Sequence, residues 1–415
     1  MQVKVNEYPK TWKRTFISLW LGCFITGLGF SMTMPFMPLF METLGNFSTW
    51  QLNLYSGLAF SMTYLSQAIV SPYWGSLADR KGRKLMCMRA SGVMAFTIFL
   101  TGLVQGVWVI IFLRFLQGAF SGYINNATAF IAGETPRAKT GSAMANMMTA
   151  SVSGNLLGPI FGGAIAGAFG YRVPFFITGF MMLVAFFLTW VNTKEHFKPV
   201  AKREMKPMKE IFSQISNTKL IISMFITTLI INASLMSISP IISLLVKRLM
   251  HGQGNISLVS GIVAAAPGFG TLLVANKLGH KMDEIGPEKV LITGLVVEVL
   301  LFIPMSLVTS PWLLAVLRFF IGIADAALLP AVQTILSVDV PPAAFGRIFS
   351  YNQSFQASGG VIGPLLGSFV SSLFGYQAVF LFTALMLGFN FILVIWSQHR
   401  QVFSKEIAFI TVEMP

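Results

Sequence analysis

The sequence predicts an all-α integral membrane protein with twelve transmembrane helices in two pseudo-symmetric six-helix bundles. Three observations lead to this fold class: an apolar composition, a series of long apolar segments, and an internal repeat. The 415-residue chain is 54% hydrophobic and 11% charged, whereas soluble globular domains carry about 25% charged residues. Water is therefore not the main solvent of this chain.

The apolar segments can be counted along the chain, because a helix needs about 20 mostly apolar residues to cross a bilayer. We expect spans at 15–40, 52–75, 84–105, 107–132, 141–168, 172–192, 218–246, 256–276, 289–308, 311–336, 346–372 and 376–397. They divide the chain into an N-terminal bundle (1–192), a polar linker (193–217), a C-terminal bundle (218–397) and a tail (398–415).

The basic residues indicate the orientation in the membrane. With the N-terminus in the cytoplasm, 24 of the 29 Lys and Arg residues fall on the cytoplasmic side, as the positive-inside rule requires. An even number of helices then places both termini in the cytoplasm. The net charge of +14 is explained by topology, and we expect no nucleic-acid partner.

The two halves of the chain repeat each other at a nearly constant offset. At an offset of 204 residues, Arg114 and Gly118 coincide with Arg318 and Gly322, and at 205 the Gly-Pro pair at 158–159 coincides with 363–364. This pattern indicates a duplicated six-helix unit. Parallel repeats of this kind place the substrate path between the halves and permit alternating access.

The segment 75–84 has the sequence GSLADRKGRK and resembles the signature of the major facilitator superfamily, which implies the major facilitator fold. A helix N-terminus attracts a carboxylate, so we expect Asp79 to face the start of the eleventh helix and Arg83 to pair with Glu134. The candidate cytoplasmic gate comprises Gly75, Asp79, Gly82, Arg83, Glu134, Asp283 and Asp339. The alternative interpretation is a loop that is basic only for topology.

A second motif lies in the fifth span, at Gly154, Gly158, Pro159, Gly162 and Gly163. It resembles the motif of the twelve-helix drug:proton antiporters of the same superfamily, as does PFMPLF at 35–40. Glycines four residues apart could instead serve only close helix packing. The resemblance, which extends from about Trp12 to Trp396, implies a drug antiporter of the bacterial inner membrane, with fosfomycin and deoxycholate as suggested substrates.

Four ionisable residues lie deep within predicted spans: Arg114, Glu298, Arg318 and Asp325. Charges at this depth are costly and are functional candidates by default. Because Arg318 and Asp325 are seven residues apart, they share one helix face. Our hypothesis is that Asp325 binds the coupling proton beside Arg318, with Arg114 in the equivalent helix. The alternative is a static ion pair, and we expect Glu298 to face another helix rather than carry protons.

The remaining candidates for substrate contact are Asn125, Ser121, Pro35 and Met32. The four histidines are expected in polar loops without carboxylate partners, so the sequence predicts no enzyme, no metal site and no cofactor. The predicted partners are a drug-like molecule, protons and the lipid bilayer, and we expect a monomer. Two other functions stay open: a facilitator or symporter that imports a metabolite, and a membrane sensor that binds ligands without moving them.

Overall fold

The computed structural model describes residues 12–136, 139–196, 218–339 and 345–412. Some side chains within these ranges, including those of Asp79, Asp339 and residues 398–412, are outside the description. Every long element in these ranges is a helix. The chain folds into two compact units, one of residues 1–202 and 242–265 and the other of 203–241 and 266–415.

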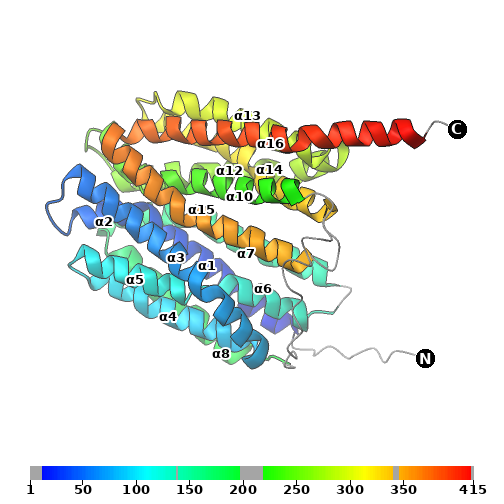
Figure 1. Cartoon of the computed structure of the whole chain (residues 1–415). Helices are drawn as coiled ribbons and strands as arrows, with labels where there is room; N and C mark the ends of the chain where they lie inside the picture. Colours follow the sequence, from blue (N-terminus) through cyan, green and yellow to red (C-terminus); the bar gives the residue numbers. More distant parts are fainter. Residues whose placement is uncertain (1–11, 137–138, 197–217, 340–344, 413–415) are drawn as a thin grey trace. The chain divides into compact units, whose positions relative to one another are not determined.

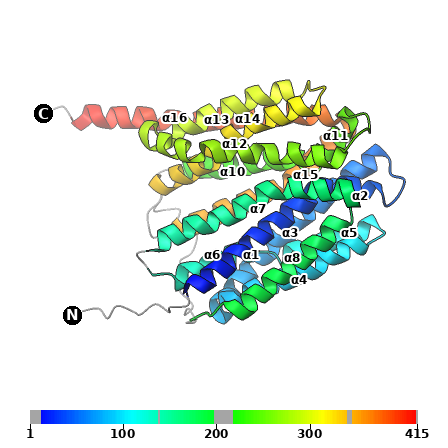
Figure 2. The same ribbon diagram turned by 180° about the vertical axis from the view of Figure 1, so that it is seen from behind.

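The first unit is built from helices that overlap the predicted spans, some of which are divided into two or three helical segments. They are α1 (Trp12–Thr33), η1 (Met34–Phe36), α2 (Met37–Glu42), α3 (Thr49–Lys81), α4 (Arg83–Leu103), α5 (Val107–Ala119), α6 (Tyr123–Glu134), α7 (Thr140–Phe169) and α8 (Val173–Asn192). The predicted span 218–246 is not one helix: its last part forms a separate helix, α11 (Ile242–Leu249), which belongs to this unit together with the first part of α12 (Ile256–Ile285). α1 packs along α7 and α4 along α8, which Figures 1 and 2 show from opposite sides.

The second unit contains the rest of α12 and five further helices. They are α10 (Thr218–Ile238), α13 (Pro287–Met305), α14 (Pro311–Asp339), α15 (Phe345–Phe374) and α16 (Tyr376–Val412). α10 packs against α15, and α13 packs against both α14 and α16. Helix α16 continues beyond residue 397, where the sequence predicted the end of the last span.

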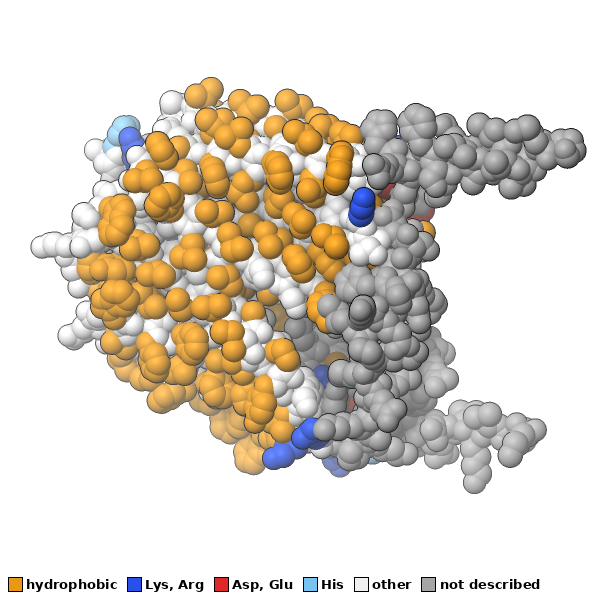
Figure 3. All heavy atoms as spheres, in the orientation of Figure 1, with side chains coloured by type: hydrophobic (Ala, Val, Ile, Leu, Met, Phe, Trp, Pro, Cys, Tyr) orange, Lys and Arg blue, Asp and Glu red, His pale blue; other side chains and the backbone are white. Residues whose placement is uncertain are grey.

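Ten helical segments in the described part of the chain are long and apolar enough to cross a membrane. Helices α3 and α13, also predicted as spans, are helical throughout but more polar: α13 contains Glu288, Lys289 and Glu298. Large apolar side chains such as Phe112, Leu273 and Phe389 are exposed, and Figure 3 shows hydrophobic side chains over much of one face. Such a surface suits contact with lipid tails rather than water.

The same glycine packing occurs inside each unit. In α7, Gly158 approaches α1 so closely that an added Cβ would lie 2.6 Å from the main-chain oxygen of Leu28. In α15, a Cβ on Gly363 would lie 2.9 Å from the Cα of Ala233 in α10. Absent side chains let two helix backbones meet where lipid provides no hydrophobic driving force. The sequence repeat is therefore also a repeat of helix packing.

The predicted span 107–132 is interrupted in the structure. α5 ends at Ala119, α6 begins at Tyr123, and Gly122 between them has a φ of +108°, a left-handed value that glycine adopts readily. The equivalent helix α14 is continuous through Asp325. The apolar pattern of the segment runs through this point without interruption, so it predicted one helix.

Candidate functional site

The second unit brings together three of the four predicted intramembrane charges. Arg318 and Asp325 lie on α14, and Asp325 is hydrogen-bonded through its side chain to Glu298 of α13. Arg318 is close enough to Asp325 for their charges to attract. Glu298 does face another helix, as expected, but what it meets there is the candidate proton carrier. The contact between Glu298 and Asp325 could not be predicted from the sequence, because the two residues are 27 positions apart and lie on different helices.

Close packing of α13 on α14 produces this contact. A Cβ on Gly294, one turn before Glu298, would lie 2.6 Å from Cδ2 of Leu328, so the two helices touch beside the carboxyl pair. The side chain of Glu298 is buried, with 2% of its surface exposed, whereas Asp325 is partly exposed. Glu298 Oε1 and Asp325 Oδ1 are buried with no hydrogen-bond partner among the described atoms.

On the other side of α14, Gly322 lets α12 approach at Pro267, and Thr271 of α12 donates a hydrogen bond of 2.8 Å to the Gly322 carbonyl oxygen. α14 is thus fixed between α12 and α13 around the stretch that carries Arg318 and Asp325. A carboxylate on a helix held in this way keeps a defined position.

The matching position in the first unit has a different chemistry. Arg114 of α5 is 2% exposed, and its Nη1 donates a hydrogen bond of 2.9 Å to Oε1 of Gln117, a neutral side chain. Ser121, which takes the place of Asp325, lies in the break between α5 and α6 and donates to the Gly118 carbonyl oxygen at 2.7 Å. The two predicted polar stripes are therefore not equivalent.

Two side chains donate hydrogen bonds to carbonyl oxygens of this break. Trp74 Nε1 donates to the Ala119 carbonyl oxygen at 2.7 Å, and Arg89 Nη2 donates to the Ser121 carbonyl oxygen at 3.0 Å. The guanidinium carbon of Arg89 lies 3.7 Å from the centre of the Trp74 ring, a cation–π contact. These two donors provide partners for carbonyl oxygens that the interruption frees within the membrane.

A small cavity of about 130 Å³, the α3–α6 cavity, lies beside the break. It is lined by Gln67, Ser71, Trp74, Gly75, Arg83, Gly118, Ala119, Ser121, Gly122, Asn125 and Asn126. Of the predicted substrate contacts it contains Ser121 and Asn125. Met32 and Pro35 are buried elsewhere in the unit, and Met32 packs against Gly162 of α7.

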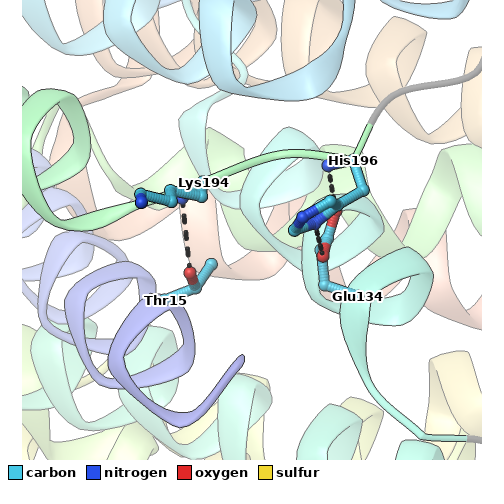
Figure 4. Close-up of polar contacts among 4 residues, drawn as sticks. All are labelled: Thr15, Glu134, Lys194 and His196. Atoms are coloured by element: carbon cyan, nitrogen blue, oxygen red, sulfur yellow. Dashed lines mark hydrogen bonds and ion pairs between the residues drawn. The ribbon is translucent and has the colours of Figure 1, made fainter. Parts of the chain in front are cut away.

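Residues of the predicted gate are held by the segment that follows α8 (Figure 4). Glu134 at the end of α6 accepts hydrogen bonds from the main-chain nitrogen of His196 at 2.6 Å and from its Nδ1 at 3.0 Å. The main-chain nitrogen of Lys194 donates to Oγ1 of Thr15 in α1 at 3.5 Å. The expectation that no histidine has a carboxylate partner is wrong for His196, because this contact joins residues 62 positions apart.

Another carboxylate from the same segment caps α4. The main-chain nitrogens of Arg83 and Lys84 donate to Glu195 at 2.6 and 2.8 Å, and Gly82 precedes them with a φ of +94°. A carboxylate at a helix N-terminus satisfies free N–H groups and offsets the helix dipole. Sequence reasoning missed Glu195, because capping signals are read close to a helix start and this residue lies more than a hundred positions away.

The other gate residues are more dispersed. Gly75 is exposed, and a Cβ there would meet nothing within 4 Å. Asp283 is exposed on α12. The side chains of Asp79 and Asp339, and with them the predicted contact of Asp79 at 345–349, lie outside the described part. His280 and His399 lie within α12 and α16, so their expected places in loops are also corrected.

The fifth-span motif packs on two sides of α7. Gly154, Gly158 and Gly162 face α1, while Gly163 faces α12, where an added Cβ would lie 2.6 Å from the main-chain oxygen of Ser257. Pro159 presents its carbonyl oxygen to Gly261 of α12. The motif thus provides close packing on two helices at once, which supports its structural interpretation.

The fold and its charged membrane helices define a multi-pass membrane transporter. The sequence profile of the Major Facilitator Superfamily matches residues 19–281 and 224–406. The chain is 49% identical to "Multidrug resistance protein MdtG" of Citrobacter koseri over 385 residues, covering 93% of this chain and 95% of the relative. The MdtG of Escherichia coli strain SMS-3-5 is also 49% identical, with coverages of 93% and 94%.

Solved structures agree on the fold. A bacterial homologue of the human lysosomal transporter Spinster, in an inward-facing and unoccupied conformation, matches with a TM-score of 0.79 at 16% identity, covering 94% of this chain and 98% of that one. The nucleoside transporter NupG matches with a TM-score of 0.74 at 14% identity, covering 94% and 98%. The chain belongs to the major facilitator superfamily and is a transporter rather than an enzyme.

Proposed function

We propose that this protein exports amphipathic, drug-like compounds across the bacterial inner membrane in exchange for protons. Alternating access of the two six-helix halves moves the substrate, and both chain termini lie in the cytoplasm. The MdtG relatives, named for multidrug resistance, support this substrate class, and fosfomycin and deoxycholate are the first compounds to test. The excess of Lys and Arg in the segments assigned to the cytoplasm supports the orientation.

The observation that carries the proposal is the charged group on α14. Asp325 is partly exposed, lies beside Arg318, and sits on a helix fixed from both sides by glycine contacts. An ionisable residue at this depth is costly and is retained where it binds ions or protons. The protonated form is neutral, so proton binding lowers the cost of burying Asp325 when the site is closed to water.

The segment after α8 supports a role for the predicted gate. Glu195 binds the start of α4, and its neighbour His196 binds the end of α6. These contacts join the ends of helices that must move together if the half acts as one body. The α3–α6 cavity, with Ser121 and Asn125, provides polar groups for substrate contact in the same unit.

The test compares wild type with Asp325→Asn in proteoliposomes that contain a pH-sensitive dye. Addition of drug to wild type should drive proton movement, and the asparagine variant should lose this movement while remaining inserted and able to bind drug. Glu284→Gln, an exposed position on α12, is the matched control and should behave as wild type. Full drug-driven proton flux in Asp325→Asn would remove Asp325 as the proton carrier.

The same assay separates the other candidate functions. A sensor would bind drug without any proton flux in wild type. A proton symporter would move protons in the same direction as the substrate rather than against it. Vesicles of known orientation distinguish these outcomes.

A further inference from the structure

The carboxyl groups of Glu298 and Asp325 lie so close together that a hydrogen bond between them needs a proton on one of them. An ionised carboxylate only accepts hydrogen bonds, and a protonated one can also donate. Since the two side chains lie within hydrogen-bonding reach of each other, a hydrogen bond between them requires a proton on at least one of the two carboxyl groups. Two ionised carboxylates in contact would repel each other strongly in an apolar environment.

We propose that Glu298 and Asp325 hold the coupling proton jointly, so that the functional unit is the pair rather than Asp325 alone. This inference rests on the proposed proton-coupled transport. Glu298 acts as the buried acid behind Asp325, and Asp325 is the member that exchanges the proton with water or substrate. The residue surfaces support this division: Glu298 is 2% exposed, whereas Asp325 is partly exposed as a residue, with its Oδ1 buried.

The charge balance around the pair favours one shared proton. With that proton, the pair carries one negative charge, which the positive charge of Arg318 offsets. Without it, the group of three has a net negative charge within the membrane, which is costly unless water or a ligand enters. Helix α16 also packs on α13. The ring contact between them is apolar: Phe380 of α16 stacks on Phe302 of α13, with ring centres 6.4 Å apart.

The internal repeat shows that the two acids occur together. At the offset of 204 residues, Glu298 corresponds to Met94 and Asp325 to Ser121. The arginine is kept in both halves, as Arg114 and Arg318, whereas both carboxyl groups are absent from the first. Glu298 and Asp325 are thus both present in the second half, and both are replaced in the first. This pattern supports a joint role for the two acids in the second unit.

The test uses full-length protein in proteoliposomes and compares Glu298→Gln, Asp325→Asn and the double variant. Glutamine has the size of glutamate and can donate a hydrogen bond to Asp325. If Glu298 only holds the helices together, Glu298→Gln should therefore leave transport unchanged. We expect Glu298→Gln to reduce drug-driven proton flux at least tenfold and to move its pH profile toward acid, because a neutral amide no longer repels ionised Asp325. The double variant should be no worse than either single one. Glu288→Gln, in the first turn of α13, is the matched control.

Infrared difference spectroscopy of the same samples provides a second measurement that does not depend on transport. Wild type should show a carboxylic acid band that shifts on labelling of glutamate with ¹³C and disappears in Glu298→Gln. If Asp325→Asn abolishes flux while Glu298→Gln keeps wild-type flux and pH profile, the shared proton is refuted and the proposed function stands. If wild type shows no drug-driven flux, the proposed function fails, and the presence or absence of the glutamate band still decides whether the pair is protonated.

Discussion

At the scale of single residues, the sequence located the charged group of the second unit because charges are rare and expensive in apolar spans. Arg318 and Asp325 could be placed on one face from their spacing alone. Their partner Glu298 could not, since no periodicity connects side chains on different helices. The same limit hid His196 and Glu195, whose partners lie 62 positions away and 111 or 112 positions away, respectively.

The glycines of α7 give a prediction at this scale. Gly162→Ala places a Cβ against the main-chain oxygen of Met32, and backbone cannot yield as a flexible side chain can. We expect a loss of about 1–3 kcal/mol from overpacking, visible as a lower midpoint of thermal unfolding in detergent. Gly133→Ala in α6, where a Cβ would meet nothing within 4 Å, is the control and should not lower it. Equal midpoints for both variants would contradict the packing described.

At the scale of elements, hydropathy predicted the existence of the long helices but not how each one ends. A continuous apolar pattern runs through 107–132, so the break at Phe120–Gly122 depended on a left-handed glycine and on donors from other helices. Helix capping likewise depends on residues that are distant in the sequence. The carboxylate that caps α4 comes from beyond α8. α3 continues to Lys81, although the sequence predicted the span to end at residue 75.

The interruption between α5 and α6 makes Trp74 important for stability. Trp74→Phe keeps an aromatic ring but removes the N–H that binds the Ala119 carbonyl oxygen. Leaving that acceptor unsatisfied should cost about 1–3 kcal/mol, measured as earlier thermal unfolding in detergent. Trp396→Phe, at a position 71% exposed, should have no such effect. A Trp74→Phe protein as stable as the control would show that the break has another source of hydrogen bonding.

The cap on α4 can be tested separately. Glu195→Ala removes the acceptor for the main-chain nitrogens of Arg83 and Lys84 and should cost about 1 kcal/mol. Glu195→Gln keeps one acceptor oxygen and should recover part of that loss. Hydrogen exchange at the first turn of α4 measures the effect directly. Unchanged exchange in the alanine variant would mean that the cap does not hold this helix end.

At the scale of the whole molecule, the repeat and the apolar spans predicted two six-helix halves, and the resemblance of the motif at 75–84 indicated the superfamily. The repeat did not predict that the two units differ in chemistry, with a neutral partner for Arg114 and two carboxyl groups near Arg318. That difference lies at Met94 and Ser121, the equivalents of Glu298 and Asp325. Methionine and serine are ordinary residues in a membrane helix, so they gave no signal by themselves.

The proposed orientation gives a prediction for cysteine labelling. In a background with Cys23→Ser and Cys87→Ser, Ser48→Cys in the turn before α3 should react with an impermeant maleimide on intact spheroplasts. Glu284→Cys near the end of α12 should react only after the membrane is opened. Both positions are exposed, so access depends on the side of the membrane. The reverse pattern would invert the orientation inferred from the basic residues.

Drug uptake into inverted inner-membrane vesicles tests the proposed export most directly. When the vesicle interior is made acidic relative to the bath, wild-type vesicles should accumulate a test drug against its concentration gradient. A protonophore should release the drug, and Asp325→Asn vesicles should not accumulate it. Accumulation in right-side-out vesicles instead, or accumulation that a protonophore leaves unchanged, would contradict proton-coupled export.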